Sequence, residues 1–252
     1  MSGRKHYPAE PDLPRCHEAV QGVSRTFALT VDVLEEPMAS QICLGYLLCR
    51  VADTVEDAGH IPPDEQTAVL ETYKRAIDPE ADADVGQFRA EVNQWLPDPA
   101  DRNADWEVVA ESPTIVATFE ELDAEARTAI VPPVVEMVDG MAMFVDRHAA
   151  EGGLRIDDRD ELEQYCYYAA GTVGNLITNL LTRDEVGDER ARKLRETAEE
   201  FGLLLQLVNV SKDVYDDYTE ENNVYLPAEW LAAEGVDQER VVHPDNRESS
   251  AR

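Results

Sequence analysis

The segment from Pro37 to Asp57 constrains the fold more than any other, because it is apolar around almost its whole helical circumference. At 3.6 residues per turn its apolar side chains point in nearly every direction; they are Ile42, Leu44, Tyr46, Leu47, Leu48, Val51 and Val55. Such a helix is stable only when other elements surround it. The segment therefore predicts a buried central helix that stops at Gly59, Pro62 and Pro63.

Helical periodicity also accounts for most of the remaining chain. After a loose lead-in over residues 1–14 we expect helices at about 15–26, 64–77, 115–148, 159–181 and 189–218, with a break near Pro132 and Pro133. The sequence has no sustained apolar-polar alternation, internal repeat or glycine-rich strand-turn-helix pattern. The expected fold class is all-α, with helices packed around one cavity or core.

Two segments depart from the helical pattern. Residues 78–111 are acidic and rich in Pro and Asp, with Trp95 and Trp106 as their few anchors, so we expect a surface insertion there. Residues 238–252 are expected to form a polar tail. The N-terminal residues lack the apolar core of a signal peptide, and we find no run long enough to cross a membrane. These features favour a cytoplasmic protein.

The acidic composition excludes one class of function. With 53 Asp and Glu against 22 Lys and Arg, the formal net charge is −31, so the surface repels nucleic acid and no such partner is expected. Acid-rich surfaces with few lysines suit concentrated salt, which predicts a halophilic source. The four cysteines lack C-x-x-C spacing and are expected to be reduced and structural; they are Cys16, Cys43, Cys49 and Cys166.

The end of the central helix carries the first of three polar stripes. Asp53 and Asp57 lie four residues apart, on one helix face with Cβ atoms about 5–6 Å apart, and Arg50 and Glu56 flank that face. Two carboxylates one turn apart suit Mg²⁺, which takes one or two protein oxygens and completes its shell with water and phosphate. The alternative is a solvated helix end in a very acidic protein.

The second stripe consists of Gln206, Asn209, Asp213 and Asp217, at steps of three, four and four residues. The residues around it from Phe201 onward are mostly apolar, so we expect the remainder of this helix to be a core element. Unpartnered polar groups in such a place would cost ~1–3 kcal/mol each. The stripe therefore favours a polar cavity or a metal, with an internal hydrogen-bond network as the alternative.

The third stripe begins at Tyr165 and contains small residues at 169–171 and at 174. Their missing volume would destabilise a helix if the space stayed empty, so we expect something to occupy it. The alternative is close packing against a neighbouring helix. Taken together, the three stripes predict a magnesium-diphosphate head above an apolar tunnel.

Five motifs resemble the squalene and phytoene synthase family in order and spacing. They are Ser24-Arg25-Thr26-Phe27, Arg50-Val-Ala-Asp53-Thr-Val-Glu56-Asp57, Tyr165-Cys-Tyr-Tyr-Ala-Ala-Gly-Thr-Val-Gly174, Gln206-Leu-Val-Asn209-Val-Ser-Lys212-Asp213-Val-Tyr-Asp216-Asp217 and Tyr225-Leu226-Pro227. The resemblance covers about residues 15–230 and implies the all-α isoprenoid synthase fold, a helical bundle around a central cavity. It also implies head-to-head condensation of two prenyl diphosphates, with Mg²⁺ and NADPH as cofactors.

The resemblance also implies a role for individual residues. The implied Mg²⁺ ligands are Asp53, Glu56, Asp57, Asn209, Asp213, Asp216 and Asp217. The implied substrate-binding residues are Ser24, Arg25, Phe27, Arg50, Gln206 and Lys212. Tyr165 acts with the four aspartates of the two D-x-x-x-D stripes as the catalytic set, and is expected to move, together with diphosphate, the proton that leaves when a cyclopropane ring closes. NADPH then reduces the rearranged cation.

Within the family, Asp53-Thr-Val-Glu56-Asp57 and the run 203–209 look like squalene synthases, most like a haloarchaeal one. The tyrosines of the third stripe look more like phytoene synthases. We therefore expect a squalene synthase acting on farnesyl diphosphate, with peripheral membrane contact for product release and an oligomeric state left open. Phytoene synthesis from geranylgeranyl diphosphate is the alternative.

Two departures from the family pattern stand out. Lys212 occupies a position where the family usually has arginine, which keeps the positive charge but loses bidentate contact with phosphate. After Pro227 the family continues with several further helices, so we expect a fragment or a shortened homologue. The rival functions are therefore a non-catalytic homologue that binds prenyl diphosphate and a merely acidic, cation-binding helical protein.

We predict that folding and activity require molar salt. The Debye length grows from about 3 Å at 1 M to about 10 Å at 0.1 M salt, which strengthens the mutual repulsion of the carboxylates as salt is withdrawn. Thermal melting across this range of KCl concentration checks the prediction. A melting temperature that stays flat or rises at low salt would contradict it.

Overall fold

The computed structural model describes residues 9–79, 81, 84–183 and 187–246. Over these residues the α-helices are α1 (Leu13–Val23), α2 (Arg25–Asp32), α3 (Met38–Glu56), α4 (Pro63–Ile77), α5 (Val85–Val92), α6 (Ala104–Ala110), α7 (Ser112–Glu120), α8 (Ala124–Arg147), α9 (Arg159–Cys166), α10 (Thr172–Leu181), α11 (Asp188–Asp216) and α12 (Ala228–Ala233). Two π-helical turns, η1 (Tyr167–Gly171) and η2 (Asp217–Glu221), and two 3₁₀ turns, η3 (Gln238–Arg240) and η4 (Pro244–Asn246), complete the list. No strand occurs in the described ranges, which confirms the all-α fold class.

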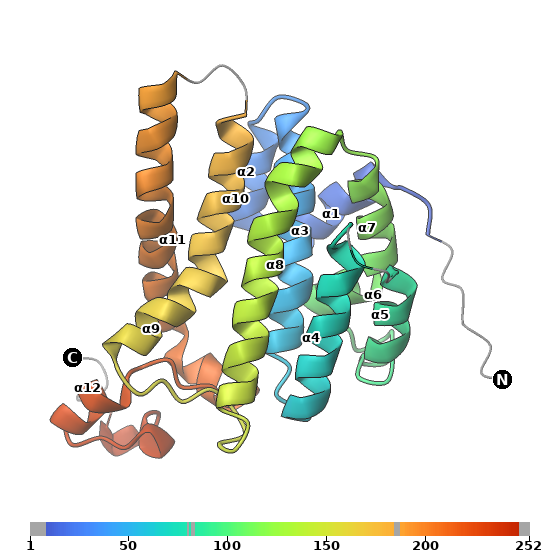
Figure 1. The fold of residues 1–252 in the computed structure, drawn as a ribbon. Helices are drawn as coiled ribbons and strands as arrows, with labels where there is room; N and C mark the ends of the chain where they lie inside the picture. The colour runs from blue at the N-terminus through green and yellow to red at the C-terminus, as the bar shows by residue number, and fades with distance from the viewer. Residues whose placement is uncertain (1–8, 80, 82–83, 184–186, 247–252) are drawn as a thin grey trace.

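The helix α3 is the axis of the bundle, as the sequence predicts. Helices α1, α4, α6, α7, α8 and α10 all pack against it (Figure 1). Its 19 residues are buried except for Met38, Tyr46, Arg50 and Asp53. The last three of these follow at steps of four and three residues and so share one face of the helix. The central helix is thus open to solvent mainly where it carries polar side chains.

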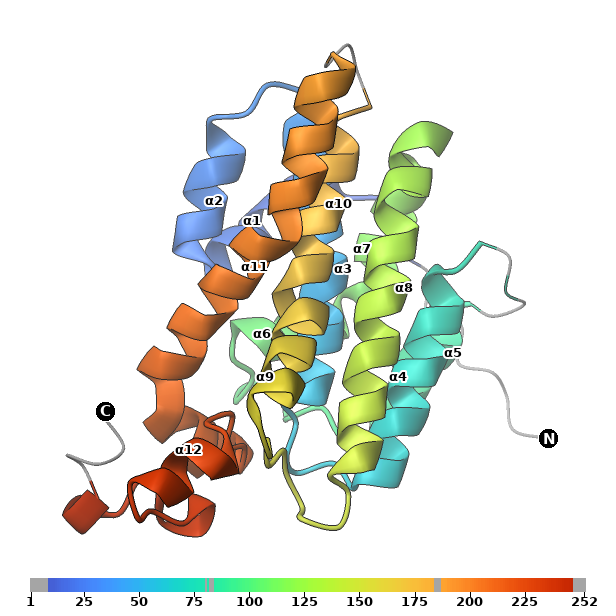
Figure 2. The same ribbon diagram turned by 60° about the vertical axis from the view of Figure 1, so that its left-hand side comes forward.

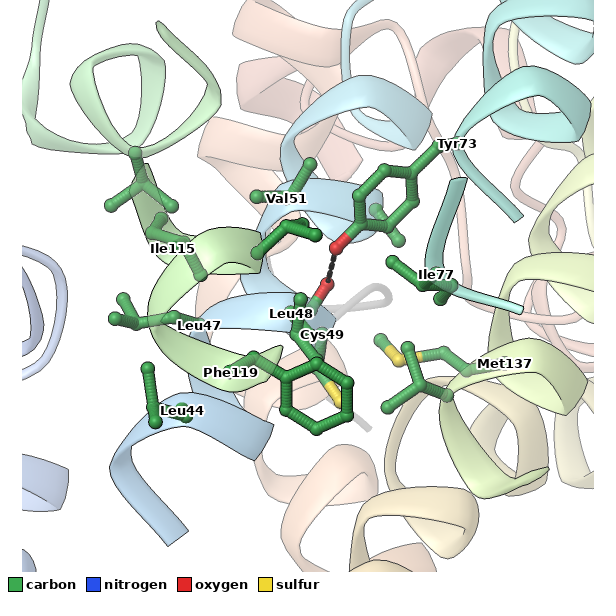
Figure 3. Close-up of a cluster of buried hydrophobic side chains, with 14 of the residues drawn as sticks. Leu44, Leu47, Leu48, Cys49, Val51, Tyr73, Ile77, Ile115, Phe119 and Met137 are labelled. Carbon is green, nitrogen blue, oxygen red and sulfur yellow. Dashed lines mark hydrogen bonds between the residues drawn. The ribbon is translucent and has the colours of Figure 1, made fainter. Parts of the chain in front are cut away.

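The core beside α3 is built from side chains of four helices (Figure 3). Leu44, Leu47 and Leu48 of α3 lie among Phe119 of α7 and further apolar residues of α4 and α8. Tyr73 of α4 donates a hydrogen bond of 2.8 Å from its hydroxyl to the carbonyl oxygen of Leu48, so its buried polar atom has a partner. Burial of each large apolar side chain here contributes about 1.5–3 kcal/mol.

The expectation of a break near Pro132 and Pro133 is wrong, because α8 continues through both prolines. A proline at position 133 cannot donate to the carbonyl oxygen of Ala129, four residues earlier. The side chain of Asn179 on α10 donates to that oxygen instead, at 3.3 Å. The helical break lies between α7 and α8.

The length and composition of α8 would suit a membrane span, which the sequence analysis did not expect. An 18-residue window of this helix has a mean hydropathy of 1.5, and 61% of the window is buried inside the protein. Such burial is what a core helix of a bundle requires.

The small residues of the third stripe allow α11 to approach η1 and α10 closely. A Cβ atom on Gly174 would lie 2.4 Å from the carbonyl oxygen of Ala198, and one on Gly202 would lie 2.4 Å from that of Ala170. The neighbouring helix therefore occupies the space that the missing side chains leave. Close helix packing, the alternative interpretation of this stripe, is what the structure has.

Parts of the two segments expected at the surface contribute to the core. Within 78–111, Phe88 and Val92 of α5 and Val109 of α6 are fully buried, because α5 packs on α4 and α6 packs on α3. Beyond residue 237, Val241 is buried with Val224, Leu231 and Val236 in a small separate cluster. Residues 247–252 of the expected tail, and 1–8 of the lead-in, lie outside the described residues.

We predict that Gly202→Ala destabilises the protein by about 1–3 kcal/mol, because the added methyl meets backbone atoms of η1 that cannot move aside. Gly22→Ala in α1 is the matched control, since its Cβ would lie 3.4 Å from Ala104 Cβ, an ordinary contact. The control should be neutral or gain up to about 1 kcal/mol of helix propensity. Denaturant unfolding of both variants measures the difference, and equal stabilities would contradict the packing argument.

Candidate active site

The solvent-exposed face of α3 carries Arg50, whose guanidinium group is held in place by neighbouring side chains. Arg50 donates from Nη1 to Asp53 Oδ2 at 2.7 Å and from Nη2 to the hydroxyl of Tyr46 at 2.7 Å. Its Nε lies 3.8 Å from Asp105 Oδ1 on α6. A guanidinium held in this way presents fixed N–H donors, which suits the recognition of phosphate oxygens.

The Ser24-Arg25-Thr26-Phe27 motif is joined to this arginine. The expected single helix over residues 15–26 is two helices, because Ser24 ends α1 and caps α2 by accepting a hydrogen bond from the backbone N–H of Phe27 at 3.2 Å. The Phe27 ring stacks on Tyr46, with centroids 4.0 Å apart and planes 20° apart. Arg25, at the first position of α2, is exposed.

Three carboxylates gather at the C-terminal end of α3. Burial raises the pKa of Asp53, Glu56 and Asp57, and the charges of the other two raise that of Asp57 further. Glu56 is only 2% exposed, and its pKa is raised to about 8. Its Oε1 atom has no hydrogen-bond partner among the described residues. Ionised carboxylates in this position are costly unless a cation joins them.

Tyr165 of α9 reaches the same end of α3. Its hydroxyl lies 3.4 Å from Glu56 Oε2 and 3.1 Å from the hydroxyl of Tyr225, and the side chain is 3% exposed. Its ring packs edge-on against Phe144 of α8, at a centroid distance of 5.3 Å. The structure thus brings the predicted tyrosine into contact with the first acidic stripe.

The second acidic stripe lies near the C-terminal end of α11. Lys212 Nζ is 3.0 Å from Asp213 Oδ2. The pKa of Asp217 is raised to about 7 by burial and by repulsion from Asp213 and Asp216. Upstream, Asn209 Nδ2 donates to Gln206 Oε1 at 3.5 Å, the outer limit of a hydrogen bond.

The expectation that the rest of α11 is a core element is confirmed on one side of the helix only, where Val210 is buried and Leu203 and Leu207 pack against the same cluster. Phe201, Leu204, Leu205 and Val208 are between 49% and 60% exposed. The helix lies at the edge of the bundle, where α10, η1 and α9 contact one side of it (Figure 1). Figure 2 shows it running down to the segment that carries α12. The apolar residues of α11 therefore predicted more burial than the helix has.

Glu221 lies close enough to both acidic stripes to interact with their charges, and it is not among the residues predicted from the sequence. Its pKa is raised to about 8, mainly by burial and then by the charges of Asp217 and Asp53, which belong to different stripes. Glu221 also raises the pKa of Glu56 and Asp57. The signal was present, because Glu221 continues the four-residue step from Asp213 and Asp217. The π-helical turn η2, which sequence periodicity does not reveal, sets its final direction.

A cavity of about 330 Å³ adjoins Glu56 and Glu221. His60, Gln66, His148 and Asn223 are among its other lining residues. Its size is at the lower end for a small-molecule site. The cavity opens beside the acidic cluster, at the end of the bundle where α3 and η2 both stop.

The donor chemistry of the two stripes fits Mg²⁺, which prefers carboxylate and other hard oxygen ligands. The unpartnered Oε1 of Glu56 and the raised pKa of its neighbours are what carboxylates show when they lack a compensating cation. Within the described ranges, no three His, Cys, Asp or Glu side chains are close enough to form a ready-made metal site. The ligands would therefore have to come together when metal and diphosphate bind.

Comparison with known proteins identifies the family. The sequence profile of the family described as Squalene/phytoene synthase matches residues 20–252. The chain is 30% identical over 220 residues to a squalene synthase of Ganoderma lucidum and 25% identical over 240 residues to that of Schizosaccharomyces pombe. These alignments cover 87% and 95% of this chain but only 44% and 49% of the relatives, so the chain spans about half of their length.

Solved structures share the fold. A structure of TcSQS with the ligand BPH1237 superposes with a TM-score of 0.76 at 24% identity, covering 94% of this chain and 64% of that one. A dehydrosqualene synthase in complex with a ligand gives a TM-score of 0.57, also at 24% identity, covering 89% of this chain and 64% of that one.

We predict that the metal-free protein loses stability as the pH rises from 5 to 8. Glu56 has an ordinary pKa of 4.5 when exposed and one of about 8 in the fold. The folded state therefore binds more protons in this interval, and its stabilisation, complete below pH 4.5, is lost as the pH rises through 8. Calorimetry in EDTA measures the fall in melting temperature, at ~2–4 °C for each kcal/mol.

Glu56→Gln should make this decline shallower, because the amide does not ionise, while Asp57, Asp217 and Glu221, whose pKa values are also raised, keep the rest of it. Glu196→Gln, at an exposed position of α11, is the control and should keep the full decline. If both variants lose stability with pH as steeply as the parent chain, Glu56 is not the group responsible.

Proposed function

Because the chain belongs to the squalene and phytoene synthase family, we propose that it condenses two farnesyl diphosphates head to head and forms squalene. The observation that carries the proposal is the contact of the buried Tyr165 hydroxyl with Glu56 at the acidic end of α3, where Glu221 links the second stripe. The squalene synthases among its relatives support the choice of product.

The diphosphate groups are held by the cations on either side of the acidic cluster. Arg50 is fixed by Asp53 and Tyr46 and offers N–H donors in a constant direction. Arg25 and Lys212 are exposed, and Lys212, whose Nζ lies 3.0 Å from Asp213 Oδ2, can exchange that carboxylate for an oxygen of the substrate. These three side chains hold the non-bridging oxygens while the allylic carbon–oxygen bond ionises.

The carboxylates of the two stripes are the proposed Mg²⁺ ligands. Asp53 and Asp57 would hold the metal from the C-terminal end of α3, and Asp213 and Asp217 would hold it from the end of α11 and the start of η2; Glu56, Asn209 and Asp216 are further candidates. When bound, Mg²⁺ stabilises the negative charge that develops on the departing diphosphate. The aspartates would hold the metal near Arg50, whose guanidinium would bind the same diphosphate.

Tyr165 handles the proton that is lost when the cyclopropane ring closes. Burial, together with the charges of Glu56 and Asp57, raises the pKa of Tyr165 well above its usual value. The residue is therefore a neutral phenol, which passes a proton by accepting one and donating another. Its position between Glu56 and the apolar ring of Phe144 suits transfer of the proton from a hydrocarbon to the departed diphosphate, which would lie at the acidic cluster.

Two parts of the proposal rest on the proposed product and not on described residues. We propose that NADPH is the reductant. We also propose that the protein works in the cytoplasm and releases its apolar product at a membrane surface. Both follow from the proposed product, since squalene formation needs a reductant and squalene itself is insoluble in water.

The test is incubation with farnesyl diphosphate and Mg²⁺ in molar KCl, with and without NADPH. We expect presqualene diphosphate without NADPH and squalene with it. A higher kcat/KM for geranylgeranyl diphosphate, with a product that does not depend on NADPH, would favour the phytoene alternative. Binding of either diphosphate without turnover would favour a non-catalytic homologue, and any longer product of the same gene should be assayed in parallel.

We predict that Asp53→Asn and Asp213→Asn each lower kcat by about 100- to 1000-fold, as the loss of one group that stabilises developing charge does elsewhere. The substitution keeps side-chain volume, so helical content should not change. Titration calorimetry should show weaker Mg²⁺ binding in the presence of diphosphate. Asp146→Asn, at an exposed position of α8, is the control, and near-parental turnover by both site variants at limiting Mg²⁺ would sink the assignment.

A further inference from the structure

The loop that joins α8 to α9 carries a buried arginine that the mechanism above does not use. Arg155 donates from Nε to Glu239 Oε1 at 2.8 Å and from Nη1 to the backbone carbonyl oxygen of Leu154 at 2.9 Å. The same Nη1 donates to the backbone carbonyl oxygen of Asn222, and Nη2 donates to Asn222 Oδ1 at 3.0 Å. The guanidinium group therefore binds both oxygen atoms of one residue, Asn222.

Asn222 is the residue at which the π-helical turn η2 ends. Its backbone is left-handed, with φ 61° and ψ 30°, and its N–H donates to the carbonyl oxygen of Asp217. The N–H of Asn223 donates to the same oxygen at 2.9 Å. A left-handed residue that closes a helix in this way provides partners for carbonyl groups that the helix end leaves free. Arg155 is thus joined through a single residue to the backbone of Asp217, which belongs to the second acidic stripe.

The end of η2 also lies against the loop that follows α3. A Cβ atom on Gly59 would lie 2.7 Å from the carbonyl oxygen of Glu221, and Gly59 comes only two residues after Asp57. On the other side, Asn223 Oδ1 accepts a hydrogen bond of 2.9 Å from the backbone N–H of Leu154. Residues 221–223 are therefore held between the end of the first acidic stripe and the loop that carries the buried arginine.

Stability alone does not account for an arginine at this place. The side chain of Arg155 is 8% exposed, whereas that of Glu239, its ion-pair partner among the described residues, is 64% exposed. The desolvation of a buried charge often costs more than such a pair returns, and an apolar side chain of similar volume is often at least as stabilising. The best-attested use of a buried charged group is to select one arrangement of the chain over close alternatives.

The close alternative here is an α-helical turn over the same residues. A π turn joins residues five apart and an α turn residues four apart, so the change would move the N–H of Asn222 from Asp217 to the carbonyl oxygen of Tyr218. The two oxygens of Asn222 would then turn away from Arg155, because a planar guanidinium group binds two oxygens together in one orientation only. The contact between Arg155 and Asn222 therefore favours the π turn over the α turn.

We propose that Arg155 is a positioning residue that holds η2 in its π-helical form through Asn222 and so fixes Asp217 and Glu221 against the end of α3. The role rests on the function proposed above, in which Asp217 and the carboxylates of α3 hold the same metal and diphosphate. Without Arg155 the second acidic stripe keeps all of its side chains but loses its fixed distance from the first.

The first test needs neither metal nor substrate. Arg155→Met keeps an unbranched side chain and removes every donor. We expect the backbone amide of Asn223 to exchange with deuterium at least about 10-fold faster, because its hydrogen bond to Asp217 opens more often. Arg89→Met is the matched control, since Arg89 is also buried, at 8% exposed, and donates to the carbonyl oxygen of Ala110 at 2.9 Å. It should leave the exchange of Asn223 unchanged, as two-dimensional NMR measures.

The second test measures the binding of inorganic pyrophosphate in the presence of Mg²⁺, by titration calorimetry in molar KCl. Arg155→Met should bind about 10-fold more weakly, because residues that orient metal ligands typically contribute 10- to 100-fold in affinity. Arg155→Lys should lose less, since its ammonium group can still donate to one oxygen of Asn222. Glu239→Gln keeps an accepting oxygen for the arginine, and it and Arg89→Met should bind like the parent chain. A purely structural role would lower the melting temperature of Arg155→Met and leave its affinity for pyrophosphate unchanged.

The outcomes separate this proposal from the function on which it rests. A parent chain that does not bind pyrophosphate with Mg²⁺ overturns the proposed function, and the binding role of Arg155 with it. If the parent chain binds, parental affinity in Arg155→Met overturns the positioning role alone, and so does an exchange rate at Asn223 that is unchanged or equally raised in Arg89→Met. Faster exchange and weaker binding in Arg155→Met only, or the same changes on a smaller scale in Arg155→Lys should the methionine variant not fold, support the role.

Discussion

The structure depends on burying carboxylates at the end of a helix that is otherwise mostly apolar. The burial of α3 places Glu56 in the core, where an ionised group is costly unless charges or hydrogen bonds offset it. Arg50, Tyr165 and the end of α11 all converge on this point from different elements. Buried carboxylates would only destabilise a structural protein. A site for Mg²⁺ and diphosphate requires them, because Mg²⁺ supplies the missing positive charge.

Much of this could be predicted from the sequence, because the strongest signals are local. The all-round apolar character of residues 37–57 fixed the central helix, and a step of four placed Asp53 and Asp57 one turn apart. The contact of Tyr165 with Glu56 spans 109 positions. It could be expected only through resemblance to a family, since no periodicity connects two helices so distant in the chain.

The remaining features depend on tertiary contacts that sequence patterns do not encode. The apolar run of α11 predicted burial, but burial depends on which elements lie next to a helix and not on its composition alone. Pro133 predicted a break, but the Asn179 side chain satisfies the carbonyl oxygen that the proline leaves free. Tyr225 belongs to one of the motifs that resemble the family, and Asn223 lies two residues before it. The hydrogen bond between Tyr225 and Tyr165 of α9, and the one between Asn223 and Leu154, follow from packing and not from a sequence pattern.

The π-helical turn η2 makes the direction of the following residues depend on the number of residues in the turn. A π turn is one residue wider than an α turn, so the residues after Asp217 emerge at a different angle from the one that α-helical spacing would give. Removing one residue between Asp217 and Asn222 would return the turn to α geometry and move Glu221, Asn223 and Tyr225 together. A single insertion or deletion here would therefore bring different side chains next to Tyr165 and Asp53 without any substitution. Selection can act on the number of residues at this point as well as on their identity.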